Sequence, residues 1–83
     1  MHELSIALRI REMAEEQVGA ARAGEIVAVG LDVGDDSGLE PNNLAFCLDA
    51  VLAELPFRGP RAEIARCAGD VLRLTYLEMN DGR

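Results

Sequence analysis

The short spacing between two strand-like segments constrains the topology of this chain more than any other feature of its sequence. Residues 61–67 (RAEIARC) and 70–79 (DVLRLTYLEM) both have the composition of β-strands, and only Ala68 and Gly69 separate them. A turn this short is typical of an antiparallel hairpin. The sequence therefore predicts that these two strands pair directly with each other.

Two other segments have the apolar periodicity of amphipathic helices. Residues 3–22 carry apolar side chains on one side, and Gly24 follows as a stop signal. Residues 41–54 begin at Pro41, which suits the first position of a helix. The expected buried rows are Ile6, Ile10, Met13, Ala14 and Ala21 in the first helix, and Leu44, Cys47, Leu48, Val51 and the following Leu55 in the second. The side chains expected to lie outside these rows, and so to be exposed, are Leu4, Leu8 and Phe46.

Residues 25–34 (EIVAVGLDVG) predict a strand whose apolar face consists of Val27, Val29, Leu31 and Val33. The expected order of elements is α-β-α-β-β. The economical arrangement is an α+β fold of two layers, with two helices against a three-stranded mixed sheet. If the first two strands are parallel, the second helix forms a crossover between them.

The composition limits the classes of partner. The 83 residues form one small domain, 1–83, with fifteen acidic residues against eight basic ones, all arginine. A net charge of −7 argues against nucleic acid and against an anionic membrane surface as partners. No run of apolar residues is long enough for a membrane span, and no basic-then-apolar leader precedes the first helix. Cys47 and Cys67 are expected to be reduced thiols of a cytoplasmic protein.

The sequence does not favour an enzyme. It contains no Ser/His/Asp set, no phosphate-binding glycine loop and no paired carboxylates at a recognisable spacing. The acidic residues Asp32, Asp35, Asp36 and Glu40 could attract a metal, but a solvated loop is the preferred interpretation. Cys47 is expected to be a small buried side chain, and Cys67 either a residue without a role or a stray thiol ligand.

The only histidine, His2, stands beside the N-terminal amine in the opening Met1-His2-Glu3. A terminal histidine is commonly a surface residue without a role. Here, however, the α-amine, the intervening amide and the imidazole are nitrogen donors that could form consecutive chelate rings. Ni(II) with nitrogen ligands favours a square-planar arrangement of this kind.

Several segments resemble the hydrogenase-maturation nickel chaperones, the HypA/HybF family. MHELSIA (1–7) is similar to the opening of that family, and residues 27–52 are similar to its strand, its Ser-Gly loop and its second helix. PFRGPRAEIARC (56–67) and LRLTYLEM (72–79) resemble its last two strands. The resemblance implies a metallochaperone that binds Ni(II) through Met1 and His2. Glu3 is implied as a residue that orients or tunes the site, and its amide is a candidate fourth donor.

The family inserts a zinc domain with two Cys-x-x-Cys pairs between its last two strands, and this chain departs from that pattern. Cys67 lies where the first zinc cysteine is expected, but the sequence runs directly on to the last strand. We therefore expect no structural zinc, which needs four ligands. The resemblance implies a maturation GTPase and the hydrogenase large subunit as partners. A bare sheet edge could also pair with a second copy in a homodimer. The alternative function is a scaffold or interaction protein that keeps the fold without relaying nickel.

Overall fold

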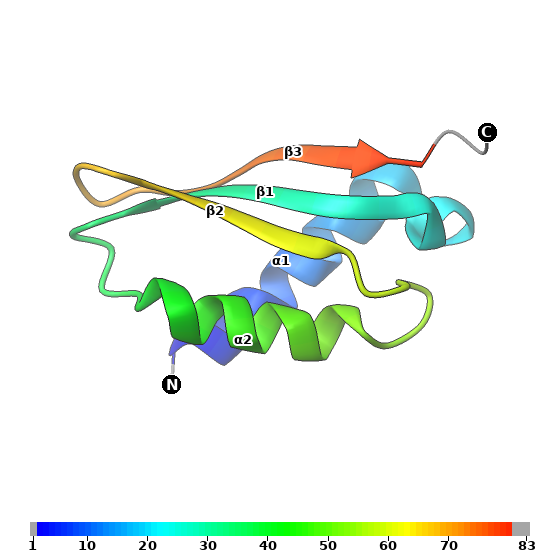
Figure 1. Cartoon of the computed structure of the whole chain (residues 1–83), viewed down its shortest axis with the longest axis horizontal. Coiled ribbons are helices and arrows are strands. Elements are labelled where there is room, and N and C mark those ends of the chain that lie inside the picture. The colour runs from blue at the N-terminus through cyan, green and yellow to red at the C-terminus, as the bar shows by residue number, and fades with distance from the viewer. Residues whose placement is uncertain (1, 81–83) are drawn as a thin grey trace.

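The structure, a computed structural model, describes residues 2–80 of the chain. Its elements are α1 (His2–Val18), the 3-10 helix η1 (Ala20–Glu25), β1 (Ile26–Gly34), α2 (Pro41–Leu52), β2 (Arg61–Cys67) and β3 (Leu72–Met79). Figure 1 shows two layers, with α1 and α2 against one face of a three-stranded sheet. The predicted α+β fold is confirmed. No helix within the described residues is long and apolar enough to cross a membrane.

The order of the strands in the sheet is β2-β1-β3, with β2 parallel and β3 antiparallel to β1. The predicted hairpin between residues 61–67 and 70–79 is therefore wrong, because β1 lies between them. Residues 68–71 carry the chain over the end of β1 instead. Four extended residues span roughly 13 Å, and two strand spacings amount to about 10 Å, so this short connection is long enough to cross one strand. The parallel pairing confirms that α2 forms a crossover between β1 and β2.

Backbone hydrogen bonds hold this crossing against the end of β1. The Gly34 N–H donates to the Val71 carbonyl over 2.7 Å, and the Asp36 N–H donates to the Gly69 carbonyl over 2.9 Å. A Cβ on Gly34 would lie 2.0 Å from the Gly69 carbonyl oxygen, so only glycine admits this approach. As a result, the apolar β1 has a neighbour on both edges, and β2 and β3 lie at the edges of the sheet.

The hydrophobic core lies between the helices and the inner face of the sheet. In α2, Leu44, Leu48 and Val51 are buried as predicted, and Cys47 is half-buried against the core. Leu55 is 78% exposed, because α2 ends at Leu52 and the chain turns away before Leu55 can continue the row. The largest fully buried side chains are Phe57, Ile26, Leu31, Leu44, Leu48, Leu52, Val29 and Val33.

Helix α1 ends four residues earlier than predicted. Gly19 has φ of 83°, a left-handed conformation that favours glycine and stops the helix, and residues 20–25 continue as η1. Ala21 consequently leaves the predicted buried row and is exposed. Ile10 and Ala14 are buried, Ile6 packs partly against the core, and Met13 is only half-buried. The predicted exposure of Leu4, Leu8 and Phe46 is confirmed.

The predicted apolar face of β1 is wrong at its first residue, Val27. The pairing with β3 shifts register between Ile26 and Ala28, so Ile26 enters the core, while Val27 is half-buried outside it. The outer face of β1 carries the small residues Ala28 and Gly30. The ring of Tyr76 lies over Gly30, where a Cβ would come within 2.1 Å of the ring, and its hydroxyl donates to Glu63. Small residues on β1 thus let side chains of the two edge strands meet across it.

Candidate functional site

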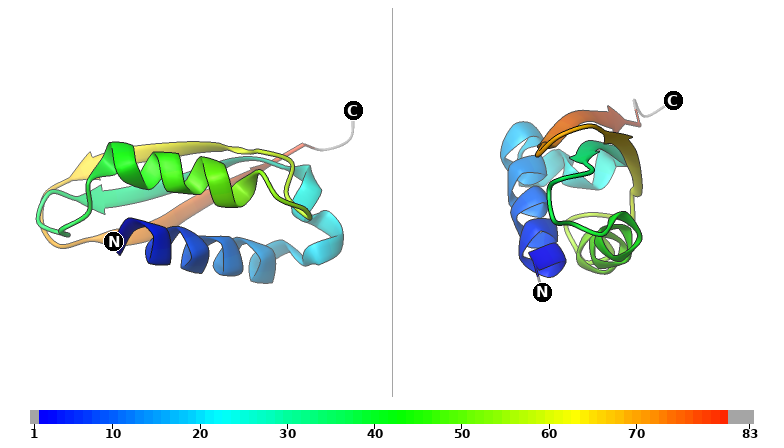
Figure 2. Two further views of the ribbon diagram at one scale, coloured as in Figure 1. Left: turned by 90° about the horizontal axis from the view of Figure 1, so that it is seen from below. Right: turned by 90° about the vertical axis from the view of Figure 1, so that its left-hand side faces the viewer.

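The two helices run in the same direction, and their N-termini meet at one end of the molecule (Figure 2). Near the start of α1, Glu3 contacts the start of α2. Two turns further along, Arg11 donates to the carbonyls of Val51 and Leu55 at the other end of α2. Hydrogen bonds near both ends of α2 therefore connect it to α1.

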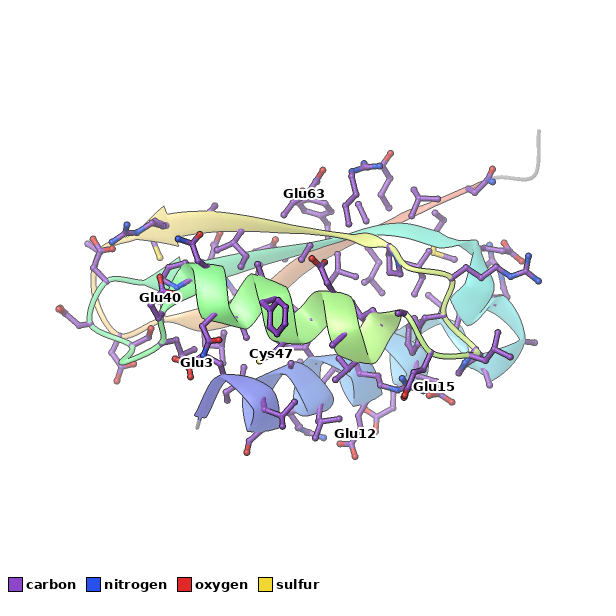
Figure 3. All side chains as sticks on the ribbon, turned by 60° about the horizontal axis from the view of Figure 1, so that its bottom comes forward. Glu3, Glu12, Glu15, Glu40, Cys47 and Glu63 are labelled. Atoms are coloured by element: carbon purple, nitrogen blue, oxygen red, sulfur yellow. The ribbon has the colours of Figure 1, made fainter. Side chains whose placement is uncertain are left out.

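The Glu3 carboxylate joins the two helix starts. Its Oε2 accepts the Glu40 N–H over 2.9 Å, and its Oε1 accepts the Asn43 side-chain amide over 3.2 Å. Glu3 is only 8% exposed, and Figure 3 shows it beside Glu40. The Glu40 N–H immediately precedes α2, where backbone donors have no partner within the helix. Glu3 therefore supplies an acceptor from outside the helix.

Hydrogen bonding lowers the pKa of Glu3 below its ordinary value of 4.5. The largest cause is the Glu40 N–H, followed by the N–H of Glu3 itself, and the Asn43 amide adds to these. Partial burial acts in the opposite direction but does not offset the hydrogen bonds. The carboxylate is therefore charged at neutral pH, and its negative charge lies at the start of both helices, where a helix dipole favours it.

Glu40 is the N-cap of α2, which corrects its predicted place in a solvated acidic loop. Its side chain accepts the Asn43 N–H over 2.8 Å and the Asn42 N–H over 3.2 Å, and Pro41 occupies the first turn as predicted. The sequence alone predicted neither the cap nor the contact with Glu3. An acidic residue directly before a helix-starting proline was the available signal for the cap, whereas no local signal predicts a partner 40 residues away.

The predicted ligands Met1 and the His2 imidazole lie outside the part of the chain that the structure describes in full. Met1 precedes the described residues, and of His2 only the backbone, as the first residue of α1, is described. Their role as metal ligands stays a prediction. Glu3, the third residue of that prediction, is held by α2, so its carboxylate is placed to orient the start of α1.

The other candidate ligands do not converge. Asp32 pairs with Arg73 over 2.8 Å, and Asp35 pairs with Arg66 over 2.9 Å. Cys47 lies on α2 and Cys67 at the end of β2, both as free thiols that are partly exposed. Among residues 2–80, no group of three or more His, Cys, Asp or Glu side chains could hold a metal ion.

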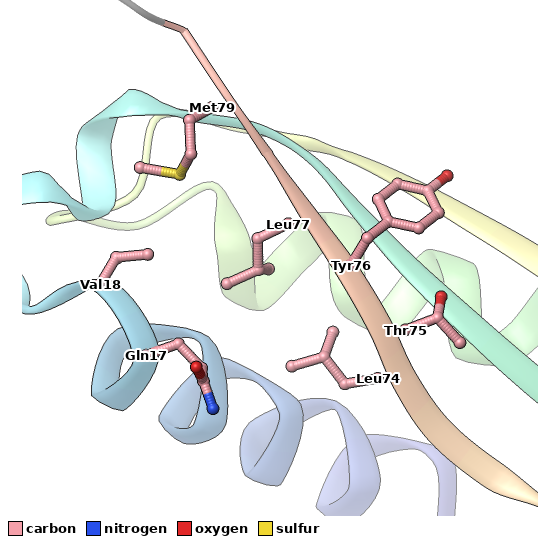
Figure 4. Close-up of a pocket in the computed structure, with 7 residues that line it drawn as sticks. All are labelled: Gln17, Val18, Leu74, Thr75, Tyr76, Leu77 and Met79. Atoms are coloured by element: carbon pink, nitrogen blue, oxygen red, sulfur yellow. The ribbon is translucent and has the colours of Figure 1, made fainter.

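A hollow of about 370 Å³ lies at the opposite end of α1 (Figure 4). Gln17 is 14 residues beyond Glu3, about 21 Å along the helix axis, so this hollow is remote from the helix N-termini. Its lining mixes polar and apolar side chains and has Tyr76 as its only titratable residue. The lining residues are Gln17, Val18, Leu74, Thr75, Tyr76, Leu77 and Met79. The hollow contains no set of groups that could perform acid–base or nucleophilic catalysis.

Comparison with known proteins gives a consistent result. A family model described as "Hydrogenase/urease nickel incorporation, metallochaperone, hypA" matches residues 1–72. Relatives named hydrogenase maturation factor HypA are 39% identical in Azotobacter chroococcum, 36% in Geobacter metallireducens and 33% in Albidiferax ferrireducens, each over 69 residues. The aligned part is 83% of this chain and 60–61% of each relative. The chain thus spans about three fifths of their length. No solved structure matches.

Proposed function

We propose that this chain, which belongs to the HypA family of hydrogenase and urease nickel-incorporation metallochaperones, binds one Ni(II) at its N-terminus. It exchanges the ion with a partner protein. The observation that carries the proposal is the family match from residue 1, which includes Met1, His2 and Glu3. In this proposal nickel is the cargo of the protein.

The start of α1 suits the proposed chemistry. The α-amine of Met1 and the imidazole of His2 are nitrogen donors, and the backbone amides between and after them complete a planar set that Ni(II) favours. The first N–H groups of a helix have no acceptor within the helix, so coordination there does not break the helix ladder. Glu3, whose carboxylate is engaged by α2, supports the site by orientation.

Electrostatics also supports the proposal. A cation at the N-terminus of a helix is opposed by the helix dipole. Here the carboxylates of Glu3 and Glu40 lie at the two helix starts and offset that term. The net charge of −7 attracts cations at longer range. The carboxylates of Glu3 and Glu40 therefore give the two helix starts a negative charge that favours a cation.

The remaining parts of the proposal follow from the family. Residues 1–83 are proposed to be a nickel-binding domain without the zinc subdomain, since the chain crosses from β2 to β3 through residues 68–71. A maturation GTPase and the hydrogenase large subunit are the proposed partners. The cytoplasm, where free thiols such as Cys47 and Cys67 stay reduced, is the proposed compartment. A homodimer through the open edge of β3 is also proposed.

Isothermal titration of Ni(II) into untagged protein at neutral pH tests the function. We expect one ion per chain, with the weak visible absorption of a square-planar site. His2→Ala, which removes the imidazole, and an N-terminal extension, which displaces the amine, should each abolish or greatly weaken binding. If all three forms bind alike, nickel lies elsewhere. If none binds, the scaffold alternative replaces the metallochaperone.

A further inference from the structure

A long-range hydrogen bond ties the first turn of α1 to the first turn of α2. The side-chain amide of Asn43 donates to Glu3 Oε1 over 3.2 Å, between residues 40 positions apart. The second oxygen of the same carboxylate accepts the Glu40 N–H over 2.9 Å. Because both oxygens are engaged, the rotation of the carboxylate is fixed as well as its position. At 8% exposure it is also shielded from competing water.

Asn43 is itself held in place. Its backbone N–H donates to Glu40 Oε1 over 2.8 Å, and the next residue, Leu44, donates its N–H to the Glu40 carbonyl over 2.9 Å. Leu44 is fully buried, so its packing in the core holds the first turn of α2 in place. The amide that reaches Glu3 therefore extends from a rigid base, and it transmits the position of α2 to the start of α1.

We propose that Asn43 is a positioning residue for the N-terminal nickel site. Through Glu3 it fixes the backbone from which the Met1 amine and the His2 imidazole extend. Donors that are ordered before the ion arrives lose less conformational entropy when they bind it. This inference rests on the proposed function and assigns to α2 a part in the same site.

The neighbouring residue provides a matched control. Asn42 carries the same side chain in the same turn of α2, is exposed, and contributes its backbone N–H to the Glu40 cap. Replacing its side chain leaves both bonds to Glu3 intact. A second control, Ile26→Val, shortens a buried side chain at the start of β1 and lowers the stability of the fold without changing either helix start.

The experiment titrates Ni(II) into four untagged full chains at one neutral pH: wild type, Asn43→Ala, Asn42→Ala and Ile26→Val. Thermal melts without nickel rank their stabilities, and visible spectra report the geometry of the bound ion. We expect Asn43→Ala to weaken nickel binding about tenfold and to shift the d–d absorption, as the loss of a partner behind a metal ligand typically does. Asn42→Ala and Ile26→Val should stay within about twofold of wild type and keep its spectrum.

The outcomes separate this inference from the proposed function. If the wild type binds nickel and Asn43→Ala binds it equally well with the same spectrum, the positioning role is overturned and the nickel site stands. If Ile26→Val loses as much affinity as Asn43→Ala, the effect belongs to general stability, and the positioning role is again overturned. A wild type that takes up no nickel overturns the proposed function, and the role of Asn43 with it.

Discussion

The carboxylates of Glu3 and Glu63 both accept hydrogen bonds, and both have a pKa below the ordinary 4.5. Their surroundings differ. Glu3 is buried between two helix starts and accepts a backbone N–H and an amide. The Glu63 side chain is 41% exposed on the outer face of the sheet, where it accepts the Tyr76 hydroxyl and the Arg61 guanidinium. A downward shift of the pKa therefore arises in two very different places.

The difference shows which polar contacts can influence a distant group. Solvent screens the pairs around Glu63, and such exposed pairs contribute little to stability. The bonds to Glu3 are shielded and connect segments 37 and 40 residues apart. They can thus transmit a change in α2 to the N-terminus, whereas a change around Glu63 should remain on the outer face of the sheet.

Among substitutions that leave the proposed nickel donors in place, the largest expected effect is that of Glu3→Ala on nickel binding. The substitution keeps the backbone amide at position 3 as a donor but removes the carboxylate that holds the start of α1. Nickel affinity should fall roughly 10- to 100-fold, the usual range for loss of a group that orients a metal ligand. Isothermal titration measures the effect, and Glu63→Ala is the control that should bind nickel like the wild type. If Glu3→Ala and Glu63→Ala lose the same nickel affinity, the buried carboxylate of Glu3 has no special influence on the N-terminus.

The next effect concerns acid stability without nickel. Because the pKa of Glu3 is lowered on folding, the unfolded chain binds more protons at this residue than the folded one. Its stabilising contribution is present above pH 4.5 and is lost as pH falls through the lowered value. Glu3→Gln should therefore give a flatter decline of the unfolding midpoint between about pH 5 and pH 3. Glu63→Gln should flatten it less, since solvent screens that group. A larger change in Glu63→Gln would reverse the expected order.

The sequence predicted the elements better than their arrangement. Residues 61–67 form a strand as predicted, and the starts of β1 and β3 were placed within two residues. These assignments depend on local periodicity and on turn residues such as Pro41. The prediction of a hairpin was wrong because the short spacing between two strands does not distinguish a turn from a connection that crosses a third strand. The crossing also depends on the close approach of Gly34 to Gly69, which are far apart in the sequence. The bond between Asn43 and Glu3 was missed because the two residues are 40 positions apart.

A smaller effect is expected from Gly30→Ala on the outer face. A Cβ there would lie 2.1 Å from Tyr76 Cε2, so the ring must move and separate from Glu63. Because the obstacle is a half-exposed side chain and not backbone, stability should fall by only about 1–3 kcal/mol, as measured by chemical denaturation. Nickel affinity should stay unchanged. A loss of nickel affinity would mean that the outer face is coupled to the N-terminus after all.

The smallest effect is expected from Glu63→Gln on the pKa of Tyr76. The Glu63 carboxylate accepts a hydrogen bond from the Tyr76 hydroxyl, and its charge repels the phenolate. Both effects raise the pKa of Tyr76 above 10.0. Glu63→Gln removes that charge, so the pKa of Tyr76 should return toward 10.0, while the thermal midpoint at neutral pH moves by about 2 °C or less. The chain has one tyrosine and no tryptophan, so the ultraviolet absorbance of the phenolate in an alkaline titration reports Tyr76 alone.

Glu78→Gln is the control, because Glu78 also repels the phenolate but accepts no hydrogen bond from its hydroxyl, and the substitution should lower the pKa of Tyr76 less. If the pKa of Tyr76 is the same in wild type and Glu63→Gln, the two side chains do not pair in solution, and Glu63 does not provide the exposed counterpart to Glu3.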